Sequence, residues 1–428
     1  MHYRIAKGVF DILPQDPDPQ GNWRETHLWH FFEKTMREVA LAFGYEEIRT
    51  PIFETTDLFT RSIGSSSDIV TKEMYTFRDK GNRSLTLRPE GTAPVLRSFI
   101  EKSLHNQGKV HKFFYSLPMF RYERQQAGRY RQHHQFGVEA IGIGSPFQDV
   151  ECIHLLWTLY QRLGLQNLTL HIHSLGNEET RKAFRHALKI YLRPHVNSLS
   201  AESQLRYETN PLRILDSKDA KDQKILEEAP KILDFLGEDA KDHFNTVCAL
   251  LNDLKIPYLI NPKLVRGLDY YNQTVFEITA SELGAQNSLG GGGRYDGLIQ
   301  QLGGPDLPAF GFGAGIERIL ITMLGQNVPF PKRRAPTLFL IPLGEDAAPF
   351  SFTLGSHLRT EGISVEIDLS GKKLKNAMKA ASQKNAAFVA VIGDDEKKSG
   401  KFQLKNMQTG TVETVSSDEL ANVLQTYP

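Results

Sequence analysis

The sequence predicts an α+β domain with a helical insertion, followed by a small α/β domain. Three observations carry this prediction. Residues 112–123 and 133–143 have the pattern of two strands joined in a long antiparallel hairpin. From about residue 176 to 260, charged helical patterns replace the strand signals. Beyond a proline-rich stretch, strands and helices alternate to residue 428, which is typical of a largely parallel sheet.

The length of 428 residues suits two or three domains. We expect a first domain over 1–325, interrupted by the helical insertion at about 176–260. A linker at 326–336 contains three prolines and a run of three basic residues. The second domain is expected over 337–428.

The first domain is expected to open with a helix that begins near Asn22. Apolar residues recur there at every third or fourth position, and Gly44 supplies a C-terminal stop: Leu28, Phe31, Phe32, Met36, Val39 and Phe43. A short strand at 45–50 ends before Pro51, which cannot donate to a strand ladder. A strand at 84–88 leads into a helix for which Thr92 is the expected cap.

The remaining elements follow the same periodicities. After the hairpin we expect a helix at 150–163, a strand at 168–173, and strands at 274–279 and near 309–311. In the second domain we expect strands at 338–341, 364–367 and 387–392, and helices at 351–361 and 374–383. A final hairpin and helix follow, and Ser416 and Glu419 predict a capping box for that helix.

Composition excludes several classes of protein. Lys and Arg number 51 and Asp and Glu number 50, so the chain does not coat a polyanion. Binding of nucleic acid through a local basic patch is still compatible with this balance. Two distant cysteines predict neither a disulfide framework nor a cysteine-rich zinc site, and they indicate a reducing compartment. We expect no signal peptide, no transmembrane helix and a cytoplasmic location. No P-loop is present, and glycines spaced two by two at 311, 313 and 315 argue against a dinucleotide fold.

The hairpin concentrates polar side chains on one face. Alternation places Arg121 and Glu123 on the same side, so a guanidinium group that can bind phosphate lies beside a carboxylate. The return strand places Gln135 and Glu139 on one face across Gly137, which we expect to leave a floor for a ligand. The loop between the strands is basic, with Arg124, Arg129 and Arg131. A solvated surface loop would explain these three arginines equally well.

Three further segments are candidates for a binding site. Glu90 lies between a strand and a helix, where it could hold an ammonium group or simply favour the helix dipole. Residues 265–271 combine Arg266, Asp269 and the pair Tyr270 and Tyr271 in one loop. Four consecutive glycines at 290–293 allow the backbone to approach a ligand or another chain closely.

The last segment of this kind runs from Gly311 to Arg318. Arg318 falls in the first turn of a helix, where a cation opposes the dipole, so we expect an anionic partner for it. His171 and His173 share a strand face, but without further ligands nearby we expect an exposed face rather than a metal site. We therefore assign no side chain as a metal ligand.

These segments resemble the histidyl-tRNA synthetase family of class II aminoacyl-tRNA synthetases. Residues 120–123 with their basic loop resemble the family's motif 2, residues 311–318 resemble motif 3, and residues 22–51 resemble motif 1. Residues 87–92, 266–271 and 293–297 are similar to signatures of the histidine-specific members. The resemblance covers nearly the whole chain.

The resemblance implies a fold and a reaction. The active site would lie on an antiparallel sheet, and the C-terminal α/β domain would bind the anticodon. L-histidine and ATP would form histidyl-adenylate and pyrophosphate, and the histidyl group would pass to the terminal adenosine of the histidine tRNA, tRNA(His). The resemblance also implies a homodimer and Mg²⁺ on the leaving pyrophosphate.

The resemblance also implies roles for single residues. Arg121 and Arg266 would grip the α-phosphate as charge builds on it. Glu123 would accept a hydrogen bond from adenine, and Arg318 would meet the γ-phosphate. The expected histidine-binding residues are Glu90, Gly91, Thr92, Gln135, Glu139, Tyr270 and Tyr271. The expected tRNA contacts in the basic loop are Arg124, Gln126 and Arg129.

Two other functions stay open from the sequence. Some relatives keep the fold but act as regulatory subunits of ATP phosphoribosyltransferase; these typically lack the C-terminal domain and have a degraded Arg266-type loop, and both features are intact here. A bare RNA-binding module would not need Glu90 and Glu139 beside phosphate-binding arginines. A basic cluster in the second domain could bind RNA or be an ordinary solvated helix: Lys372, Lys373, Lys375 and Lys379.

Overall fold

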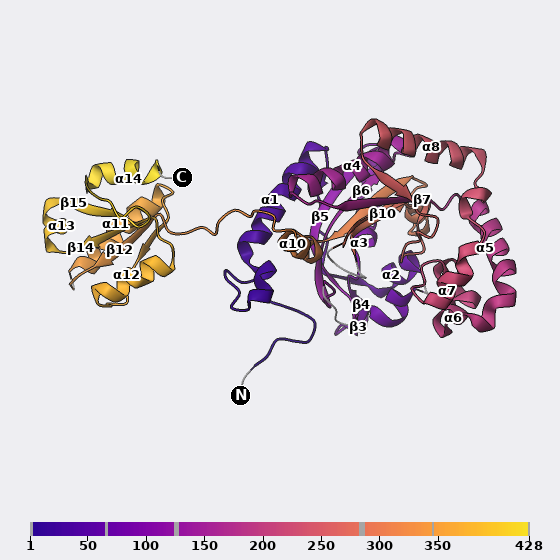
Figure 1. The fold of residues 1–428 in the computed structure, drawn as a ribbon, viewed down its shortest axis with the longest axis horizontal. Coiled ribbons are helices and arrows are strands. Elements are labelled where there is room, and N and C mark those ends of the chain that lie inside the picture. Colours follow the sequence, from indigo (N-terminus) through magenta and orange to yellow (C-terminus); the bar gives the residue numbers. More distant parts are fainter. Residues whose placement is uncertain (1–2, 65–66, 124–127, 282–286, 345, 427–428) are drawn as a thin grey trace. The chain divides into compact units, whose positions relative to one another are not determined.

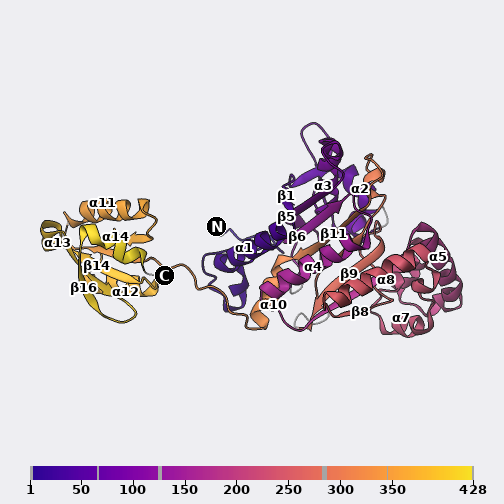
Figure 2. The ribbon, with the colours of Figure 1, turned by 90° about the horizontal axis from the view of Figure 1, so that it is seen from above.

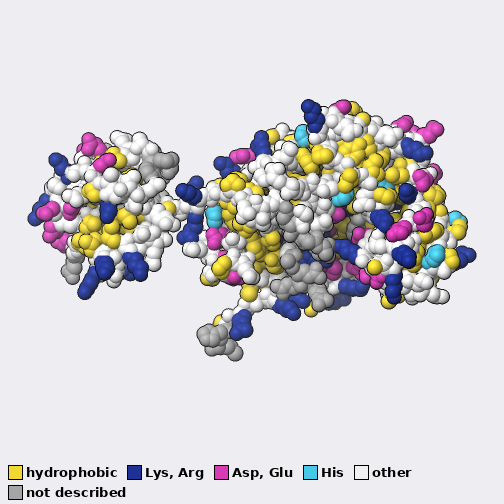
Figure 3. All heavy atoms as spheres, viewed as in Figure 1, with side chains coloured by type: hydrophobic (Ala, Val, Ile, Leu, Met, Phe, Trp, Pro, Cys, Tyr) yellow, Lys and Arg dark blue, Asp and Glu magenta, His cyan; other side chains and the backbone are white. Residues whose placement is uncertain are grey.

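The computed structural model describes residues 3–64, 67–123, 128–281, 287–344 and 346–426. The chain divides into two compact units, Met1–Pro331 and Lys332–Pro428 (Figure 1). Acidic and basic side chains are interspersed on the face seen in Figure 3. Within the described ranges, no helix has the length and apolar character needed to cross a membrane.

An eight-stranded sheet is the centre of the first unit, with order β1-β5-β6-β11-β10-β9-β7-β8 among the described residues. The strands are β1 Glu46–Glu47, β5 His111–Phe120, β6 Gln132–Ile141, β7 Leu168–Ser174, β8 Tyr258–Ile260, β9 Asn272–Ala280, β10 Ser288–Arg294 and β11 Ala309–Gly315. Neighbouring strands are antiparallel except for the outer pairs β1–β5 and β7–β8. The predicted hairpin is confirmed as β5 and β6, although β5 ends at Phe120.

Helices cover one face of this sheet and leave part of the other open. The covering helices are α1 Thr26–Ala42, α4 Pro146–Arg162, α8 Glu238–Asp253 and α10 Ile316–Gly325. Helix α8 lies alongside α4, as Figures 1 and 2 both show. The apolar stripe of α1, including Leu28, Phe32 and Met36, is buried in the core between these helices and the sheet.

A smaller layer flanks the sheet near its β5 edge. It contains the three-stranded sheet β2-β4-β3, formed by β2 Phe53–Thr55, β3 Tyr75–Arg78 and β4 Ser84–Leu87. The helices here are α2 Thr56–Ile63 and α3 Thr92–Glu101, with the short turns η2 Ile69–Glu73 and η3 Leu104–Asn106. The helix start at the chain's beginning also differs from expectation, because Asn22 lies in the 3-10 turn η1 Pro19–Arg24 and α1 begins at Thr26.

Within the range expected for a helical insertion, about 176–260, one group of helices and turns lies outside the main sheet. It consists of α5 Glu178–Leu192, η4 Arg193–Ser198, α6 Ala201–Thr209, η5 Pro211–Ile214, α7 Ala220–Ile225, η6 Leu226–Glu228 and η7 Ile232–Phe235. The expected range 176–260 also includes two elements that belong to the main sheet and its core. These are α8, which packs in that core, and β8, which pairs with β7. Three apolar residues in the strand 258–260 were too few to separate it from the preceding helices.

The glycine run 290–293 is a strand, which the sequence did not predict. As part of β10, it pairs with β9 on one side and β11 on the other, and helix α9 Leu298–Gln301 follows. A Cβ at Gly292 would collide with the carbonyl oxygen of Gly311. The glycines therefore permit a close approach, and the groups approached are the neighbouring strands.

The second unit has a five-stranded sheet of order β13-β12-β14-β15-β16 among its described residues. The strands are β12 Leu338–Pro342, β13 Val365–Ile367, β14 Phe388–Ile392, β15 Lys401–Asn406 and β16 Val412–Ser416. The first three are parallel and the last two antiparallel. The helices are α11 Ala347–Thr360, α12 Leu374–Gln383, α13 Asp394–Ser399 and α14 Ser417–Gln425, and the predicted capping box of α14 is present.

Candidate active site

A cavity of about 640 Å³ lies over the open face of the main sheet. Its floor is the backbone of β10 and β11, and one wall is the loop that precedes β9. Ten of the predicted site residues line it: Glu90, Thr92, Arg121, Glu123, Arg129, Gln135, Arg266, Tyr270, Tyr271 and Arg318. Arg124 and Gln126 lie outside the described residues.

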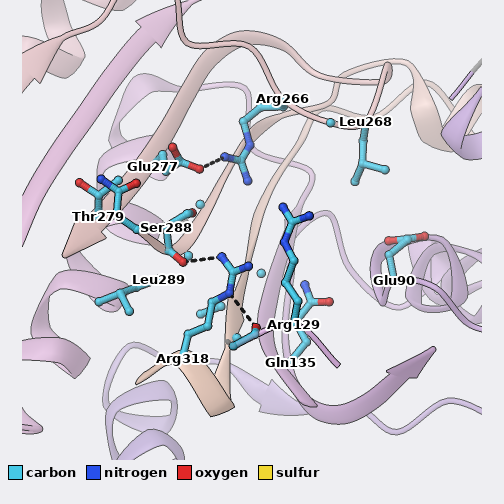
Figure 4. A pocket seen from close by; sticks show the side chains of 18 of the residues that line it. Glu90, Arg129, Gln135, Arg266, Leu268, Glu277, Thr279, Ser288, Leu289 and Arg318 are labelled. Carbon is cyan, nitrogen blue, oxygen red and sulfur yellow. Dashed lines mark hydrogen bonds and ion pairs between the residues drawn. The ribbon is translucent and has the colours of Figure 1, made fainter. Parts of the chain in front are cut away.

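Arginine side chains from separate segments converge on this cavity. Figure 4 shows the guanidinium groups of Arg129, Arg266 and Arg318 pointing toward a common space, with Glu90 on the opposite side. Arg121 also lines the cavity and donates from Nε to the carbonyl oxygen of Pro89 at 2.7 Å. Glu123 lies between two of these cations, 3.1 Å from Arg129 Nη1 and 3.8 Å from Arg121 Nη1. The cavity is therefore suited to a polyanionic ligand.

Arg266 pairs with a carboxylate outside its own loop. Its Nη1 donates to Oε1 of Glu277 on β9 at 3.0 Å. Asp269, the acid in the same loop as Arg266, accepts hydrogen bonds from Asn210 and Arg213 of the insertion. The Arg266 Nε atom is buried and has no partner among the described residues. This guanidinium group therefore keeps donors available to a ligand.

Among the described residues, Arg318 bonds carbonyl oxygens rather than a carboxylate, and the anionic partner expected for it stays a prediction. Its Nε donates to the carbonyl oxygen of Gly128 at 3.1 Å, and its Nη1 donates to that of Ser288 at 2.8 Å (Figure 4). Carbonyl oxygens orient a guanidinium group without neutralising it. Burial, and then the positive charge of Arg129, lowers the pKa of Arg318. An anion bound here would offset both the burial of the Arg318 charge and its repulsion by Arg129.

Glu90 supplies the negative end of the cavity. Its side chain is buried, and its two oxygens accept from the backbone N–H groups of Thr92 at 2.6 Å and Ala93 at 2.9 Å. Glu90 therefore caps α3, and the predicted capping role of Thr92 is wrong because Thr92 is already helical. Burial raises the pKa of the Glu90 carboxyl, so an ammonium group nearby would stabilise its charged form.

Glu139 lies beneath the surface of the cavity rather than on it. It is fully buried, and it accepts hydrogen bonds from Thr92 Oγ1 at 2.7 Å, from Tyr115 Oη at 3.2 Å and from Tyr295 Oη. Burial raises the pKa of Glu139 to about 8. A carboxylate offers about four acceptor positions, so one position stays open.

The predicted ligand floor over Gly137 is already filled. Tyr115 is the cross-strand neighbour of Gly137, and its ring occupies the space where a Cβ of Gly137 or of Gly91 would lie. This tyrosine was not among the expected site residues. Its signal was present in the hairpin, because a bulky residue directly opposite a glycine fills the space that the glycine leaves.

Tyr270 and Tyr271 close the wall near Glu90. Their ring centroids are 4.7 Å apart, and both rings are largely buried while lining the cavity. Burial raises the pKa of Tyr271 to about 12, so its hydroxyl stays protonated and can donate. The Tyr270 hydroxyl is buried without a hydrogen-bond partner among the described residues. A polar ligand group would satisfy it.

The histidines of β6 and β7 are more buried than the sequence predicts. His173 is buried, and burial lowers its pKa to about 4, so the expectation of an exposed face is wrong for it. His171 lines the cavity, and His133 does so too, with its pKa lowered to about 3 by burial and by Arg121. In the described parts of the chain, no group of three or more His, Cys, Asp or Glu side chains could hold a metal ion.

The chain is similar in sequence to one family of known proteins over nearly its whole length. Residues 17–319 match the family model of histidyl-tRNA synthetase, and residues 337–427 match that of an anticodon binding domain. The chain is 57% identical over 425 residues to a histidine–tRNA ligase of Protochlamydia amoebophila, covering 99% of this chain and 100% of the relative. It is 48% identical over 434 residues to that of Chlamydia pneumoniae, covering both chains in full.

A solved structure agrees with the sequence comparison. Apo histidyl-tRNA synthetase from S. aureus has a TM-score of 0.83 and 38% identity, covering 99% of this chain and 100% of that chain. An ATP phosphoribosyltransferase regulatory subunit/histidyl-tRNA synthetase from Bacillus halodurans C, at 23% identity, covers 92% of this chain and 99% of its own with a TM-score of 0.63, which shows a shared fold. With an open antiparallel sheet, an arginine-lined cavity and matches over both units, the chain belongs to the histidyl-tRNA synthetase family.

Proposed function

We propose that the protein is a histidine–tRNA ligase. It activates L-histidine with ATP and then transfers the histidyl group to the 3′-terminal adenosine of tRNA(His). The observation that carries this proposal is the convergence of Arg129, Arg266 and Arg318 on one side of a cavity whose other side presents Glu90. A triphosphate matches the first side, and the α-amino group of an amino acid matches the second.

In the first step, a carboxylate oxygen of histidine attacks the α-phosphorus of ATP, and the bond to the bridging oxygen breaks to release pyrophosphate. Arg121 and Arg266 approach the reacting phosphate from different walls of the cavity, where they stabilise the developing charge. Arg318 binds the γ-phosphate, and Glu123 accepts from the adenine amino group. Positioning and electrostatics suffice, so no covalent enzyme intermediate is needed.

The histidine side is built from Glu90, Gly91, Thr92 and Gln135 around the α-amino group. Tyr271 and Glu139 bind the two imidazole nitrogens, which need a donor and an acceptor. Glu139 reaches the ring through its remaining acceptor position, between the hydroxyls that hold it. Tyr270 supplies the free hydroxyl on the same wall.

Magnesium is assigned to the phosphates and not to a protein cage. Glu277, the cavity carboxylate nearest Arg266, is already engaged in an ion pair, and the described residues contain no metal-ligating cluster. Mg²⁺ usually keeps several waters and binds through substrate phosphates, where it would neutralise the leaving pyrophosphate.

The second domain and the hairpin loop would hold the tRNA. The match to an anticodon binding domain supports an anticodon contact for residues 337–427, with the lysines of α12 as candidates. The loop containing Arg124, Gln126 and Arg129 would meet the acceptor end. We also propose a cytoplasmic homodimer, as expected of an enzyme that serves translation.

The test is ATP–pyrophosphate exchange with each of the twenty amino acids, followed by charging of tRNA(His). We expect exchange with histidine alone and aminoacylation of tRNA(His). Exchange with a different amino acid would overturn the substrate assignment. Absence of both exchange and charging, with phosphoribosyltransferase stimulated in a mixed assay, would support the regulatory alternative.

A further inference from the structure

The loop that presents Arg266 is held mainly by the helical insertion. Residues 261–271 contain no helix or strand, so hydrogen bonds from elsewhere must fix their position. Three side chains of the insertion donate to the half of the loop that follows Arg266. A fourth, Gln223, accepts from Lys263 Nζ at 2.8 Å in the other half. The loop is therefore tied to an element that contributes little to the main sheet.

Arg213, at η5, makes two of these contacts. Its Nη2 donates to the carbonyl oxygen of Gly267 at 2.9 Å and to Oδ1 of Asp269 at 3.2 Å. Asn210 Nδ2 donates to the same Asp269 oxygen at 3.1 Å. The Arg213 side chain is only 14% exposed, so its ion pair with Asp269 is less screened than a surface pair.

Two more contacts complete the attachment. Arg181, on α5, donates from Nη1 to the carbonyl oxygen of Tyr271 at 3.0 Å. On the other side, Asp68 approaches Arg213 Nη1 at 3.8 Å, so the same arginine also faces the segment before η2. Arg213 thus joins the insertion, the loop and the layer that carries α2.

Arg266 depends on this attachment because it has little side-chain support of its own. Its ion pair with Glu277 fixes one nitrogen, while its Nε has no partner among the described residues. The position of the guanidinium group is therefore set largely by the backbone at 266 and 267. A hydrogen bond to Gly267, the next residue, acts directly on that backbone.

We propose that Arg213 is a positioning residue for Arg266, through which the helical insertion sets the geometry of the adenylate-forming arginine. This inference rests on the proposed function, because it assigns Arg213 a role in the same reaction. It makes the insertion part of the activation machinery even when no tRNA is bound.

The decisive experiment is a double-mutant cycle in ATP–pyrophosphate exchange with histidine. Arg213→Ala is measured in the natural chain and in an Arg266→Ala background. Displacing a group by about 1 Å costs up to about 10²-fold in rate, so we expect Arg213→Ala alone to lower kcat roughly 10- to 100-fold. In the Arg266→Ala background it should lower kcat by less than about twofold, because the group it positions is gone.

Two further variants separate positioning from general damage. Asp269→Asn keeps an oxygen acceptor for Arg213 and Asn210, so it should lose less activity than Asp269→Ala. Lys182→Ala is the matched control on α5, since its side chain is 71% exposed and pairs with Glu178. It should exchange at the natural rate. Thermal unfolding of every variant identifies any loss of activity caused by misfolding. If Arg213→Ala does not fold, the activities of Asp269→Asn and Asp269→Ala are compared instead.

An equal loss for Arg213→Ala in both backgrounds would overturn the inference, as would equal activity of the two Asp269 variants. The proposed function is tested separately, because it requires the unaltered chain to exchange with histidine. A chain that exchanges normally but shows no coupling between residues 213 and 266 would reject the positioning role alone.

Discussion

Arg266 meets the cavity with one carboxylate partner and a buried, unpartnered Nε. Because the proposed reaction builds negative charge on the α-phosphate, replacing this cation should affect the transition state more than histidine binding. We expect Arg266→His to lower pyrophosphate exchange by about 10²–10³-fold, the usual cost of removing one preorganised donor. The histidine dissociation constant should change much less.

The control for this variant is Arg83→His, which changes an arginine whose side chain is 78% exposed and pairs with Asp79. It should exchange pyrophosphate at the natural rate. Near-natural exchange by Arg266→His would instead assign Arg266 to structure, as the ion-pair partner of Glu277.

Glu139 makes the unfolding free energy depend on pH. Its pKa of about 8 in the folded protein lies above its ordinary value, so the folded state binds the extra proton at intermediate pH. The stability contributed by this proton is present below the unfolded pKa and is lost as the pH rises toward 8. We expect Glu139→Gln to remove a slope of up to about 1.4 kcal/mol per pH unit in that window. Urea unfolding at several pH values measures it.

The same variant tests the imidazole assignment. Glutamine has one acceptor oxygen where Glu139 has two oxygens, so it cannot serve the same three hydroxyls and a ligand, and histidine affinity should fall sharply. No other amino acid should bind well in its place, because polar groups left unpaired in the site penalise analogues. An unchanged histidine dissociation constant by calorimetry would reject this role for Glu139.

For single residues, the sequence predicted which polar side chains share a strand face better than it predicted their hydrogen-bond and ion-pair partners. The spacing of Gln135 and Glu139 correctly placed both on one strand face, since alternation is a local property. The Arg266–Glu277 pair and the contacts of Asp269 were not predictable in this way. They depend on how the loop folds back over β9 and against the insertion, which no local pattern encodes.

Among the elements, β10 places the strictest steric demand on its residues. Cβ atoms at Gly291 and Gly292 would press on carbonyl oxygens of the strands on either side. We expect Gly292→Ala to destabilise the fold by about 1–3 kcal/mol, the usual cost of overpacking a core. Gly144→Ala is the matched control, because its Cβ would make ordinary contacts with Pro308. Denaturant unfolding of both variants checks the difference, and equal stabilities would contradict it.

The elements that the sequence predicted best have strong, long periodicity. The hairpin and the alternating elements of the second unit are examples. The glycine strand and β8 were missed because glycine has a low strand propensity and three residues give no period. Pairing with neighbouring strands, a tertiary effect, determines both.

The structure changes the argument for a dimer. The apolar stripe of α1 packs against the chain's own sheet, so it is not available as a subunit interface. Exposed apolar residues instead occur around the three-stranded sheet, where Phe53 is 50% and Phe77 is 43% exposed and their rings lie 6.2 Å apart. We expect a homodimer by light scattering at micromolar concentration, weakened by Phe53→Lys. Val412→Lys, at a residue of similar exposure in the second unit, is the control. A monomeric natural chain would contradict the prediction.

We expect the first unit to activate histidine and the second unit to help bind tRNA(His). A fragment that ends at Pro331 should keep histidine-dependent pyrophosphate exchange and charge tRNA(His) poorly. Every residue assigned to adenylate formation lies in the first unit, and each unit has its own apolar core. The fragment must extend to Pro331 because Val328 and Phe330 pack against the first core, so ending near residue 325 would remove them.

Loss of the second unit should act on tRNA binding and leave activation intact. Two separate contacts on one tRNA raise the effective concentration of its acceptor end at the cavity, and the fragment retains one of them. We therefore expect a large rise in KM for tRNA(His) and a KM for histidine close to that of the full chain. Thermal unfolding first establishes that the fragment is folded. A folded fragment that charges tRNA(His) as well as the full chain does would show that residues 337–427 serve some purpose other than holding the anticodon.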